Sequence, residues 1–457
     1  MLTFLNAAMT TSTQRYVSVN LGKNDLSFVK TIFANSQVIH FVIGIVVVLL
    51  IESVGLYFIN NKLQIDPLRI VTAKYILHFT ALSTFLTVIS VPYEAVINAH
   101  ENMVFLAVAS IVEAVLKFGA AISLFYIDGD KLFYYGLFIL LGAISIRILK
   151  AVYAKRKYEE CNISIREWYS RDSVMELTSF ASWQLFGTLC ALGRNQGVAV
   201  VLNLFYSTVV NAAYGIANQI NGQIMFFSQT MMSAVRPQIM KSEGANDRQK
   251  MIMLSIAANK FAFFLFTFFA LPLYFQMPAV LSLWLKDVPN YSIEFCRAII
   301  LLTAMNQINM GLMTAVQAIG KIKVYQIIAG GIQLMALPVG FVFLKYGYPP
   351  YSIILVSFVL EAISTVFRMF YFRYLTGYPV VKYLKNVILV AFIPILPAIC
   401  LISVLSGYIG QDILSIFITL LCSSVVYGIS IYVIGLNKGE KLYVRNLSLK
   451  LKAKLSL

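Results

Sequence analysis

Long apolar runs, separated by short polar or basic segments, dominate the hydropathy pattern of this sequence. Runs such as 38–56 and 261–281 hold about 20 residues each, which is enough to cross the hydrocarbon core of a bilayer as a helix. The runs lack the strict apolar and polar alternation of membrane-spanning β-strands. We therefore expect an all-α polytopic membrane protein.

The same pattern predicts the order of the helices. Four spans follow the first twenty residues, at 28–60, 69–98, 103–127 and 131–153. Six more are expected at 175–206, 208–240, 251–285, 296–319, 324–344 and 351–375, and two further helices at 387–405 and 413–436. Between the two groups, charges recur at helical spacing around Ile163, Ile165 and Trp168. This spacing is typical of an amphipathic helix at the membrane interface.

An internal repeat organises the spans into two modules. Ala95-Val96 aligns with Ala315-Val316, 220 residues further on, and the same offset pairs Val104 with Val324. A module of six spans is even-numbered, so both modules insert with the same orientation. We therefore expect two parallel-repeat six-helix bundles, related by an axis along the membrane normal, plus two extra C-terminal helices.

The start of the chain departs from the repeat. The counterpart of residues 175–220 would precede Met1, so we expect a first module that lacks its first helix and a half. The cause would be a late start codon, a truncation or a naturally shortened amphipathic start. Residues 1–20 lack the basic and apolar regions of a signal peptide. The expected domains are an N-terminal transmembrane lobe at 1–158, an amphipathic cytoplasmic connector at 159–174, a C-terminal transmembrane lobe at 175–378, the two extra helices at 379–436 and a basic cytoplasmic tail at 437–457.

Composition and charge agree with a membrane protein and predict its orientation. Hydrophobic residues make up 59% of the chain and charged residues 12%, and the mean hydropathy is +0.79. The net charge is +16, and most of the 36 Lys and Arg residues, Arg368 among them, fall in connections that would share one side of the membrane. The positive-inside rule then places the C-terminus in the cytoplasm. These basic edges should meet anionic membrane lipids rather than nucleic acid.

The sequence gives little sign of catalysis or metal binding. A phosphate-binding loop of the GxxxxGK[ST] type is absent, and the connections are short and hold no paired carboxylates or Ser-His-Asp set. The three histidines, His40, His78 and His100, are widely separated, and the five cysteines show no paired spacing. We expect no enzyme, no cofactor and no metal site.

Polar side chains within the spans are the best candidates for a binding site, because each is costly in hydrocarbon. In the second module, one stripe of polar residues recurs at helical spacing and consists of Asn211, Tyr214, Asn218, Asn221 and Ser228. Its counterpart in the first module consists of Asn6, Thr10 and Thr13. Two stripes facing each other across a pseudo-twofold axis would line a hydrophilic substrate cleft. The alternative is hydrogen-bonded packing between helices.

A basic group also lies within a span. Arg194 and Asn195 belong to the segment GRNQG, whose glycines, Gly193 and Gly197, allow close backbone approach and tolerate a helix break. A guanidinium in this position can hold an anionic group through two hydrogen bonds. We expect Arg194 to bind a phosphate group of the substrate, or else to pair with a nearby acid.

Three charged side chains within spans are candidates for ion coupling. Glu113 and Lys117 are four residues apart, which is the spacing of a helical ion pair, and Glu52 stands alone in an apolar run. A buried carboxylate with a raised pKa is a natural proton carrier. Glu52 or Glu113 could therefore couple proton entry to transport, although a fixed structural pair is equally open for Glu113.

Four stretches carry a resemblance to a known family, namely VPYEAVINAHENM at 91–103, FLNAAMTTSTQRYVSVNLG at 4–22, SFASWQLFGTLCALGRNQGVAVVLNLFYSTVVNAAYGIANQIN at 179–221 and AVRPQIMKSEGANDRQK at 234–250. They are similar to the Wzx-type polysaccharide flippases, MATE-like members of the multidrug/oligosaccharidyl-lipid/polysaccharide exporter superfamily, and most similar to those of Bacteroidetes. Members of that family usually begin with one more helix and a half.

The resemblance implies two six-helix lobes around a V-shaped cavity in a bacterial inner membrane. It also implies a substrate, a polyprenyl-pyrophosphate-linked oligosaccharide that moves from the inner to the outer leaflet by alternating access for surface polysaccharide or O-antigen (lipopolysaccharide) biosynthesis, alongside other polysaccharide-assembly proteins. A cation-coupled multidrug antiporter of the same fold is the main alternative. A membrane-bound polymerase or acyltransferase is a third class, and it would need a long external loop with catalytic residues that we do not find.

Overall fold

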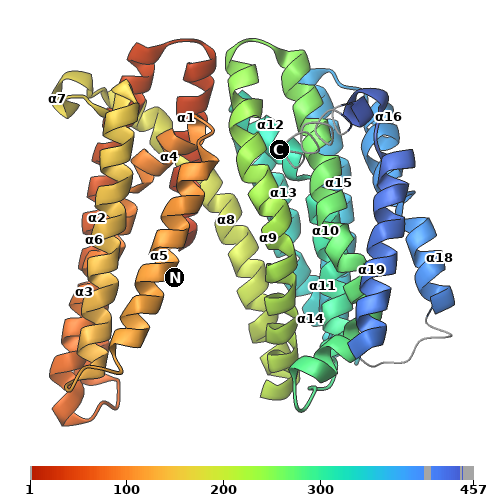
Figure 1. Cartoon of the computed structure of the whole chain (residues 1–457), viewed down its shortest axis with the longest axis horizontal. Helices are drawn as coiled ribbons and strands as arrows, with labels where there is room; N and C mark the ends of the chain where they lie inside the picture. The colour runs from red at the N-terminus through yellow and green to blue at the C-terminus, as the bar shows by residue number, and fades with distance from the viewer. Residues whose placement is uncertain (1–2, 406–412, 443–444, 446–457) are drawn as a thin grey trace, which may run out of the picture. The chain divides into compact units, whose positions relative to one another are not determined.

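The protein is all-α in a computed structural model that describes residues 3–405, 413–442 and 445 (Figure 1). Eleven helical segments in these ranges are long and apolar enough to cross a membrane. The first set of helices is α1 Thr3–Gly22, α2 Leu26–Asn61, α3 Ile70–Val88, α4 Val91–Ala99, α5 Met103–Ser123, α6 Lys131–Lys157 and α7 Ile165–Trp168, with short 3-10 turns η1 Pro67–Arg69 and η2 Glu159–Cys161. The predicted class of all-α polytopic membrane protein is confirmed.

The second set begins with two long helices and ends with shorter pieces. Its members are α8 Arg171–Phe205, α9 Thr208–Gly244, α10 Arg248–Trp284, α11 Ser292–Gln307, α12 Met310–Ile319, α13 Ile322–Leu334, α14 Ala336–Lys345, α15 Ser352–Thr376, α16 Val380–Tyr383, α17 Val390–Phe392, α18 Ile395–Leu405 and α19 Ile413–Ser430, with π-helical turns η3 Leu384–Leu389 and η4 Ile431–Gly435. The predicted spans and these helices differ mainly by a few residues at their ends.

The internal repeat is visible in the order and length of the helices. A shift close to 220 residues lays α2 on α10, α3 on α11, α4 on α12, α5 on α13 and α14, and α6 on α15. The same helix is interrupted in both copies, after α3 at Ile89 and Ser90 and after α11 at Ile308 and Asn309. The duplication inferred from a few matched residues therefore extends to the secondary structure of both modules.

The turns that follow α1 and α9 show the repeat at the level of single hydrogen bonds. Asn24 and Asn246 both adopt the left-handed backbone conformation, with φ of 59° and 58°. The Asn24 N–H donates to the carbonyl oxygen of Leu21, and the Asn246 N–H donates to that of Glu243, each at 3.1 Å. Asparagine tolerates this conformation at helix C-termini better than most residues. Both turns therefore stop a helix in the same way.

The described chain divides into two compact units. Unit 1 contains Met1–Thr188, Pro237–Asp247 and Gln317–Lys323, and unit 2 contains Leu189–Arg236, Arg248–Val316 and Val324–Leu457. In unit 1, α3 packs beside α2 and α6, and α1 packs on α4 (Figure 1). Unit 2 has an apolar core in which Leu202, Phe266 and Phe295 are fully buried. Two short segments of the second module therefore belong to the first unit in space.

The connector between the modules contains less helix than we expected. The prediction of an amphipathic helix there is wrong, because α7 spans four residues, Ile165–Trp168, and α6 runs on to Lys157. Hydrogen bonds hold the connector in another conformation: Asn35 on α2 donates to the carbonyl oxygen of Trp168 at 3.2 Å and accepts from the Ser170 N–H at 3.0 Å. These tertiary contacts outweigh the helical spacing of the charges.

An acid in the connector is held close to α4. Glu160 has a side chain that is 3% exposed, and its Oε1 lies 2.5 Å from Nε2 of His100. Burial opposes ionisation of this carboxyl, but the hydrogen bond from His100, a backbone N–H and the nearby Lys30 outweigh it and hold the pKa of Glu160 below its usual range. The pair therefore fixes the connector against the end of α4.

Candidate functional site

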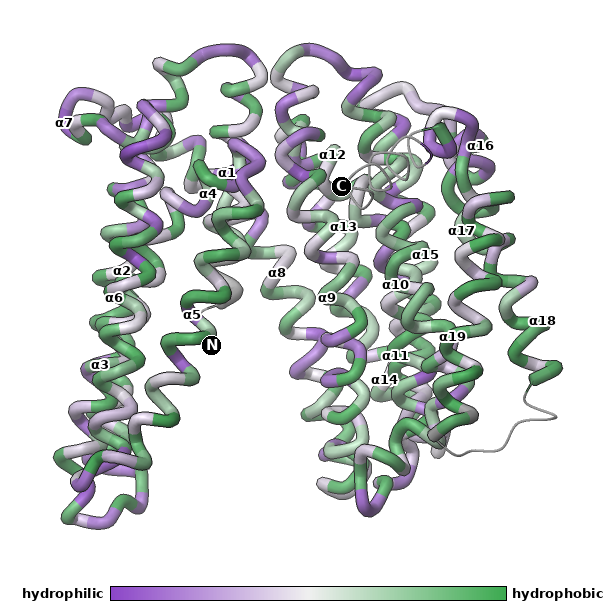
Figure 2. The backbone as a smooth tube through the Cα atoms, in the orientation of Figure 1, coloured by the Kyte–Doolittle hydropathy of each residue, from purple (hydrophilic) through white to green (hydrophobic). Residues whose placement is uncertain are grey.

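Two helices of membrane length differ from the others in polarity. The 37-residue α9 is long enough to cross a bilayer, but its sequence is too polar for it to count among the eleven apolar spans. The 20-residue α1, which corresponds to the second half of α9 in the repeat, is also outside that set. Hydrophilic residues run through the middle of α9, whereas α18 and α19 are mainly apolar (Figure 2). The two polar helices, α1 and α9, therefore occupy equivalent positions in the repeat.

The predicted stripe on α9 lies mostly inside unit 2. Tyr214, Asn221 and Ser228 are buried, Asn211 is half-buried, and Asn218 is exposed. Tyr214 packs against Phe295 and donates from its hydroxyl to the carbonyl oxygen of Asn195 at 3.3 Å. Ser228 donates to the carbonyl oxygen of Met225 at 3.0 Å. Tyr214 therefore joins α9 to α8, whereas the hydrogen bonds of Asn221 and Ser228 stay within α9. Asn218 is exposed and donates to the carbonyl oxygen of Tyr214 at 2.9 Å.

The exposed face of α9 carries polar residues that, apart from Asn218, the sequence analysis missed. Asn218, Gln219, Gln223, Gln229 and Thr230 are all exposed, and they alternate along this face with small or aromatic residues. At 3.6 residues per turn, these five positions fall within less than half of the helix circumference, so they share one side of the helix. A signal for this face was present in the sequence, because α9 contains four glutamines, Gln238 included, which is unusual for a surface in contact with lipid. We call these five side chains the polar face of α9.

Arg194 and Asn195 lie on α8 close to α9. The Arg194 guanidinium is half-buried and donates from Nε and Nη2 to Asn195 Oδ1 at 3.3 and 3.2 Å. No ion pair of Arg194 is found among residues 3–405, 413–442 and 445. α8 is continuous from Arg171 to Phe205, so the glycines beside Arg194 do not break the helix. The buried acid Glu361 on α15 attracts the Arg194 guanidinium electrostatically, but its carboxylate accepts a hydrogen bond from Arg368. The Arg194 guanidinium therefore retains donors for an anionic group of a ligand.

The two glycines beside Arg194 serve close packing. A Cβ atom on Gly197 would lie 2.5 Å from Cδ1 of Leu337, and one on Gly193 would lie 3.3 Å from Cδ2 of Leu334. Both leucines belong to the segment that contains α13 and α14. The expectation of close approach at these glycines is thus confirmed, and their partner is the side-chain layer of neighbouring helices in unit 2.

The candidate residues of α1 divide into three cases. Thr13 is buried, and its Oγ1 lies 2.8 Å from Oγ of Ser36, which in turn contacts Nδ1 of His40 at 3.2 Å. Thr10 is half-buried. Asn6 lies on α1, but its side chain is outside the described part of the structure. Thr13 is therefore part of a buried hydrogen-bonded network in unit 1, and the assignment of all three to a cleft stays a prediction.

The carboxylates predicted for ion coupling both have cationic or titratable partners. Glu52 is not alone, because its carboxylate lies 2.8 Å from Nδ1 of His78 on α3. Glu113 accepts from Nζ of Lys117 at 2.6 Å, and this pair is largely exposed. The helical ion pair is confirmed. Residue spacing alone could not reveal His78, because the contact depends on the packing of α2 against α3.

A buried ion pair in unit 2 was not predicted. Arg368 donates from Nη1 to Oε1 of Glu361, and both side chains are less than one tenth exposed. Arg368 lies inside α15 and not in a cytoplasmic connection, so its predicted place is wrong. Thr365, between the two on the same helix face, contacts Asn309 at the interruption between α11 and α12 at 2.8 Å. These charges sit in the interior of a membrane-spanning unit.

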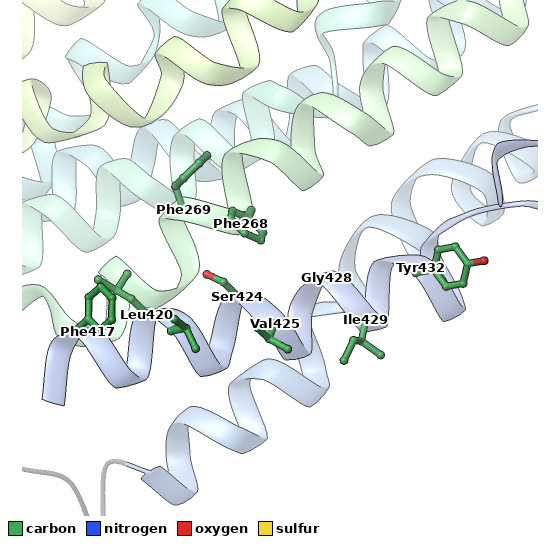
Figure 3. Close-up of a pocket in the computed structure, with 10 residues that line it drawn as sticks. Phe268, Phe269, Phe417, Leu420, Ser424, Val425, Gly428, Ile429 and Tyr432 are labelled. Carbon is green, nitrogen blue, oxygen red and sulfur yellow. The ribbon is translucent and has the colours of Figure 1, made fainter. Parts of the chain in front are cut away.

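Two apolar grooves lie on unit 2. One has a volume of about 780 Å³ and is lined by α10 and α19, with Phe268, Phe417 and Val425 along its walls (Figure 3). The other, of about 1220 Å³, is lined mainly by α10 and the C-terminal helices, and the buried pair of Lys260 and Glu440, 2.7 Å apart, lies at its wall. Their composition suits hydrocarbon chains better than a sugar. In the described residues, no group of three or more side chains has the composition of a metal site.

We predict that the polar face of α9 contributes to transport. Replacing Gln219 and Gln223 together with leucine removes two exposed hydrogen-bonding groups, which contribute about 1 kcal/mol each. The expected result is a transport rate about 30-fold lower at normal abundance. The matched control is Gln64→Leu in the connection between α2 and α3, where glutamine is also exposed. An unchanged transport rate in the double variant would exclude this face from the substrate path.

The overall fold matches solved transporters of one superfamily. No protein-family profile and no curated protein sequence matches this chain. An outward-facing multidrug resistance MATE family transporter of the MOP superfamily has a TM-score of 0.69 at 14% identity, over 82% of this chain and 85% of that chain. A MATE protein in its bent conformation has a TM-score of 0.73 at 13% identity, over 84% and 85%.

A third similar structure comes from an archaeon. It is a MOP superfamily transporter from Pyrococcus furiosus described by the reverse polarity of its binding pocket, with a TM-score of 0.68 at 14% identity over 82% of this chain and 85% of that chain. Identities this low establish the fold and leave the substrate open. The chain is therefore a multi-pass membrane protein with the fold of MATE transporters of the MOP superfamily.

Proposed function

We propose that the protein is a flippase that moves a polyprenyl-pyrophosphate-linked oligosaccharide across a bacterial inner membrane. The observation that carries this proposal is the polar face of α9 together with Arg194. A membrane-length helix with exposed amides on one face is unstable against hydrocarbon, and such a face therefore borders water or a polar ligand. Amides bind sugar hydroxyls, and a guanidinium binds a pyrophosphate.

The charge of the candidate site favours an anionic substrate. Arg194 lies on α8, its nearest hydrogen-bond partner is the neutral Asn195, and the five side chains of the polar face are uncharged. A cation-coupled drug antiporter would need an acidic cavity for its substrate. The predicted coupling acids, Glu52 and Glu113, are instead neighbours of His78 and Lys117. The reverse-polarity pocket described for the archaeal transporter shows that this fold accommodates more than one charge pattern.

The proposed substrate also fits the grooves outside the polar face. A polyprenyl chain is a long hydrocarbon that stays in the bilayer while the head group crosses. The grooves beside α10 offer apolar surface of that kind, with the exposed Phe417 and the half-buried Phe268 lining one of them. The polar and apolar surfaces of the protein thus match the two ends of an amphiphile.

Deletion of the gene in its host tests the proposed function. We expect lipid-linked oligosaccharide to accumulate on the cytoplasmic leaflet and surface glycan to disappear, and both changes to be reversed by the wild-type gene. Loss of drug resistance with intact surface glycan would instead support the antiporter. The multidrug antiporter remains the second candidate because the solved structures with this fold include multidrug resistance proteins.

A further inference from the structure

Two glycines at equivalent positions of the repeat bring two helix ends into backbone contact inside unit 1. Gly22 ends α1 and Gly244 ends α9. A Cβ atom on Gly22 would lie 2.2 Å from the carbonyl oxygen of Lys241, and one on Gly244 would lie 1.9 Å from that of Val19. The partner of each glycine stands three residues before the other glycine, so the two contacts are reciprocal. Both positions require a residue without a side chain.

A carboxylate from α4 clamps this crossing. Glu101, directly after α4, accepts hydrogen bonds from Lys241 Nζ at 2.7 Å and from Gln238 Nε2 at 3.0 Å. Its backbone is left-handed, with φ of 61°. Gly320, at the end of α12, is also left-handed, with φ of 90°. A glutamate costs energy in this conformation, where glycine does not. Position 101 therefore holds an acid although its backbone conformation favours glycine.

A second contact joins α1 to the interrupted helix of the other module. Arg15 on α1 donates from Nε to the carbonyl oxygen of Gln317 at 3.0 Å, at the end of α12. A Cβ atom on Gly320 would lie 2.5 Å from Nη2 of Arg15. A guanidinium is favourable at the C-terminus of a helix, where carbonyl oxygens are unpaired and the dipole is negative. Thus α1 contacts the end of α12 through Arg15, and α9 contacts Glu101, beyond the end of α4, through Lys241.

We propose that Glu101, Lys241 and the paired glycines form a latch that holds the cytoplasmic ends of the two modules together and releases once in each transport cycle. The inference depends on the proposed function, because it assigns the latch to alternating access. These contacts lie at the ends of α1, α4 and α9, next to connections that the distribution of Lys and Arg predicts to be cytoplasmic. The contact between the ends of α1 and α9 is made by glycines and backbone carbonyls and has no interlocked side chains. The two helix ends can therefore separate readily once the ion pair between Glu101 and Lys241 is broken.

Spin labels on either side of the crossing measure whether it opens. Lys23 and Ala245 follow the two glycines directly, and both are exposed. In the full-length chain with its five native cysteines replaced by alanine, the variants Lys23→Cys and Ala245→Cys carry the labels. We expect the distance between the two labels to be mainly short in the parent protein. We expect Glu101→Gln to raise the fraction of molecules with a longer distance about two- to fivefold, which is the range for a partly exposed ion pair.

Further variants separate the clamp from the glycine contact. Glu101→Gly relieves the backbone strain and removes the acid, and it should open the crossing like Glu101→Gln. Gly22→Ala should raise the longer population about tenfold or more, because the new methyl group meets a backbone carbonyl that cannot rotate away. The control is Gly142→Ala on α6, where an added Cβ meets nothing within 4 Å. Exchanging the charges, Glu101→Lys with Lys241→Glu, should restore the short distance.

The outcomes distinguish the latch from the proposed function. Distances in Glu101→Gln and Glu101→Gly that equal those of the parent, or a charge exchange that restores nothing, would overturn the latch whatever the substrate is. The measurement needs no substrate, so an open crossing in these variants supports the latch even if lipid-linked oligosaccharide is not transported. If the ends of α1 and α9 separate as expected but lipid-linked oligosaccharide is not transported, the result would count only against the proposed substrate.

Discussion

Replacing Arg194 with alanine is expected to lower the rate of the proposed oligosaccharide transport about 10- to 100-fold at wild-type abundance. The physical reason is the loss of charge-assisted hydrogen bonds to the pyrophosphate, which contribute about 1.5–3 kcal/mol. Arg194 is half-buried, and its hydrogen bonds go to Asn195, a neutral neighbour on the same helix. Its removal therefore leaves no buried carboxylate without a partner, and the fold should persist.

The measurement compares initial transport rates in vesicles across three variants. Arg194→Lys keeps the charge but loses the planar pair of donors, so its rate should lie between those of wild type and Arg194→Ala. Arg69→Ala, in the connection between α2 and α3, removes an exposed arginine elsewhere and should leave the rate unchanged. Normal transport by Arg194→Ala at normal abundance would end the phosphate-binding role.

Breaking the buried ion pair of α15 destabilises the protein by about 3–5 kcal/mol. Glu361→Gln leaves the guanidinium of Arg368 in a membrane-spanning unit without its carboxylate, and Arg368→Leu leaves the carboxylate without its guanidinium. Both side chains are less than one tenth exposed. Replacing both with leucine removes the two charges together, and it should recover most of the stability because apolar packing substitutes for the pair.

Thermal unfolding in detergent checks this prediction, with abundance in the membrane as a second readout. Glu113→Gln, which breaks a largely exposed pair with Lys117, should change stability by less than about 1 kcal/mol. If the single variants at Glu361 and Arg368 unfold like wild type while transport is lost, the pair serves the transport cycle. In that case its structural assignment here is wrong.

Much of the fold follows from sequence pattern. The start of α5 is predicted correctly at a position where a capping side chain is present: Asn102 precedes α5 and accepts from the Phe105 N–H at 3.4 Å, and the predicted start at Met103 is the observed one. Long apolar runs leave little choice of secondary structure in a bilayer, since each backbone group must be satisfied within the segment. The repeat then relates the helices of one module to those of the other.

The faces of the helices are harder to predict. The spacing of Asn211, Tyr214 and Asn221 correctly identifies one side of α9, but polar groups line both its packed side and its exposed side. Which side contacts the core depends on the neighbours, here Phe295 and the backbone of Asn195. A hydropathy pattern alone does not distinguish a wet face from a hydrogen-bonded packing face.

Partners that are distant in sequence also escape the pattern. Glu52 seems isolated in its own run, and its contact with His78 requires the packing of α3 on α2. The connector has helical charge spacing, yet Asn35 holds it in a non-helical conformation. In both cases a tertiary contact outweighs a local preference, and local preferences are the information that periodicity contains.

The most direct test of the account is transbilayer movement of a defined substrate by the purified protein. Vesicles would contain polyprenyl-pyrophosphate-linked oligosaccharide with a fluorophore on the sugar, and a membrane-impermeant reductant added outside would quench the label of the outer leaflet. The account predicts that quenching proceeds nearly to completion in vesicles that contain the protein, proceeds about 10- to 100-fold more slowly in Arg194→Ala vesicles, and stops at the outer-leaflet fraction in empty vesicles. Quenching that stops at that fraction with the wild-type protein would contradict it.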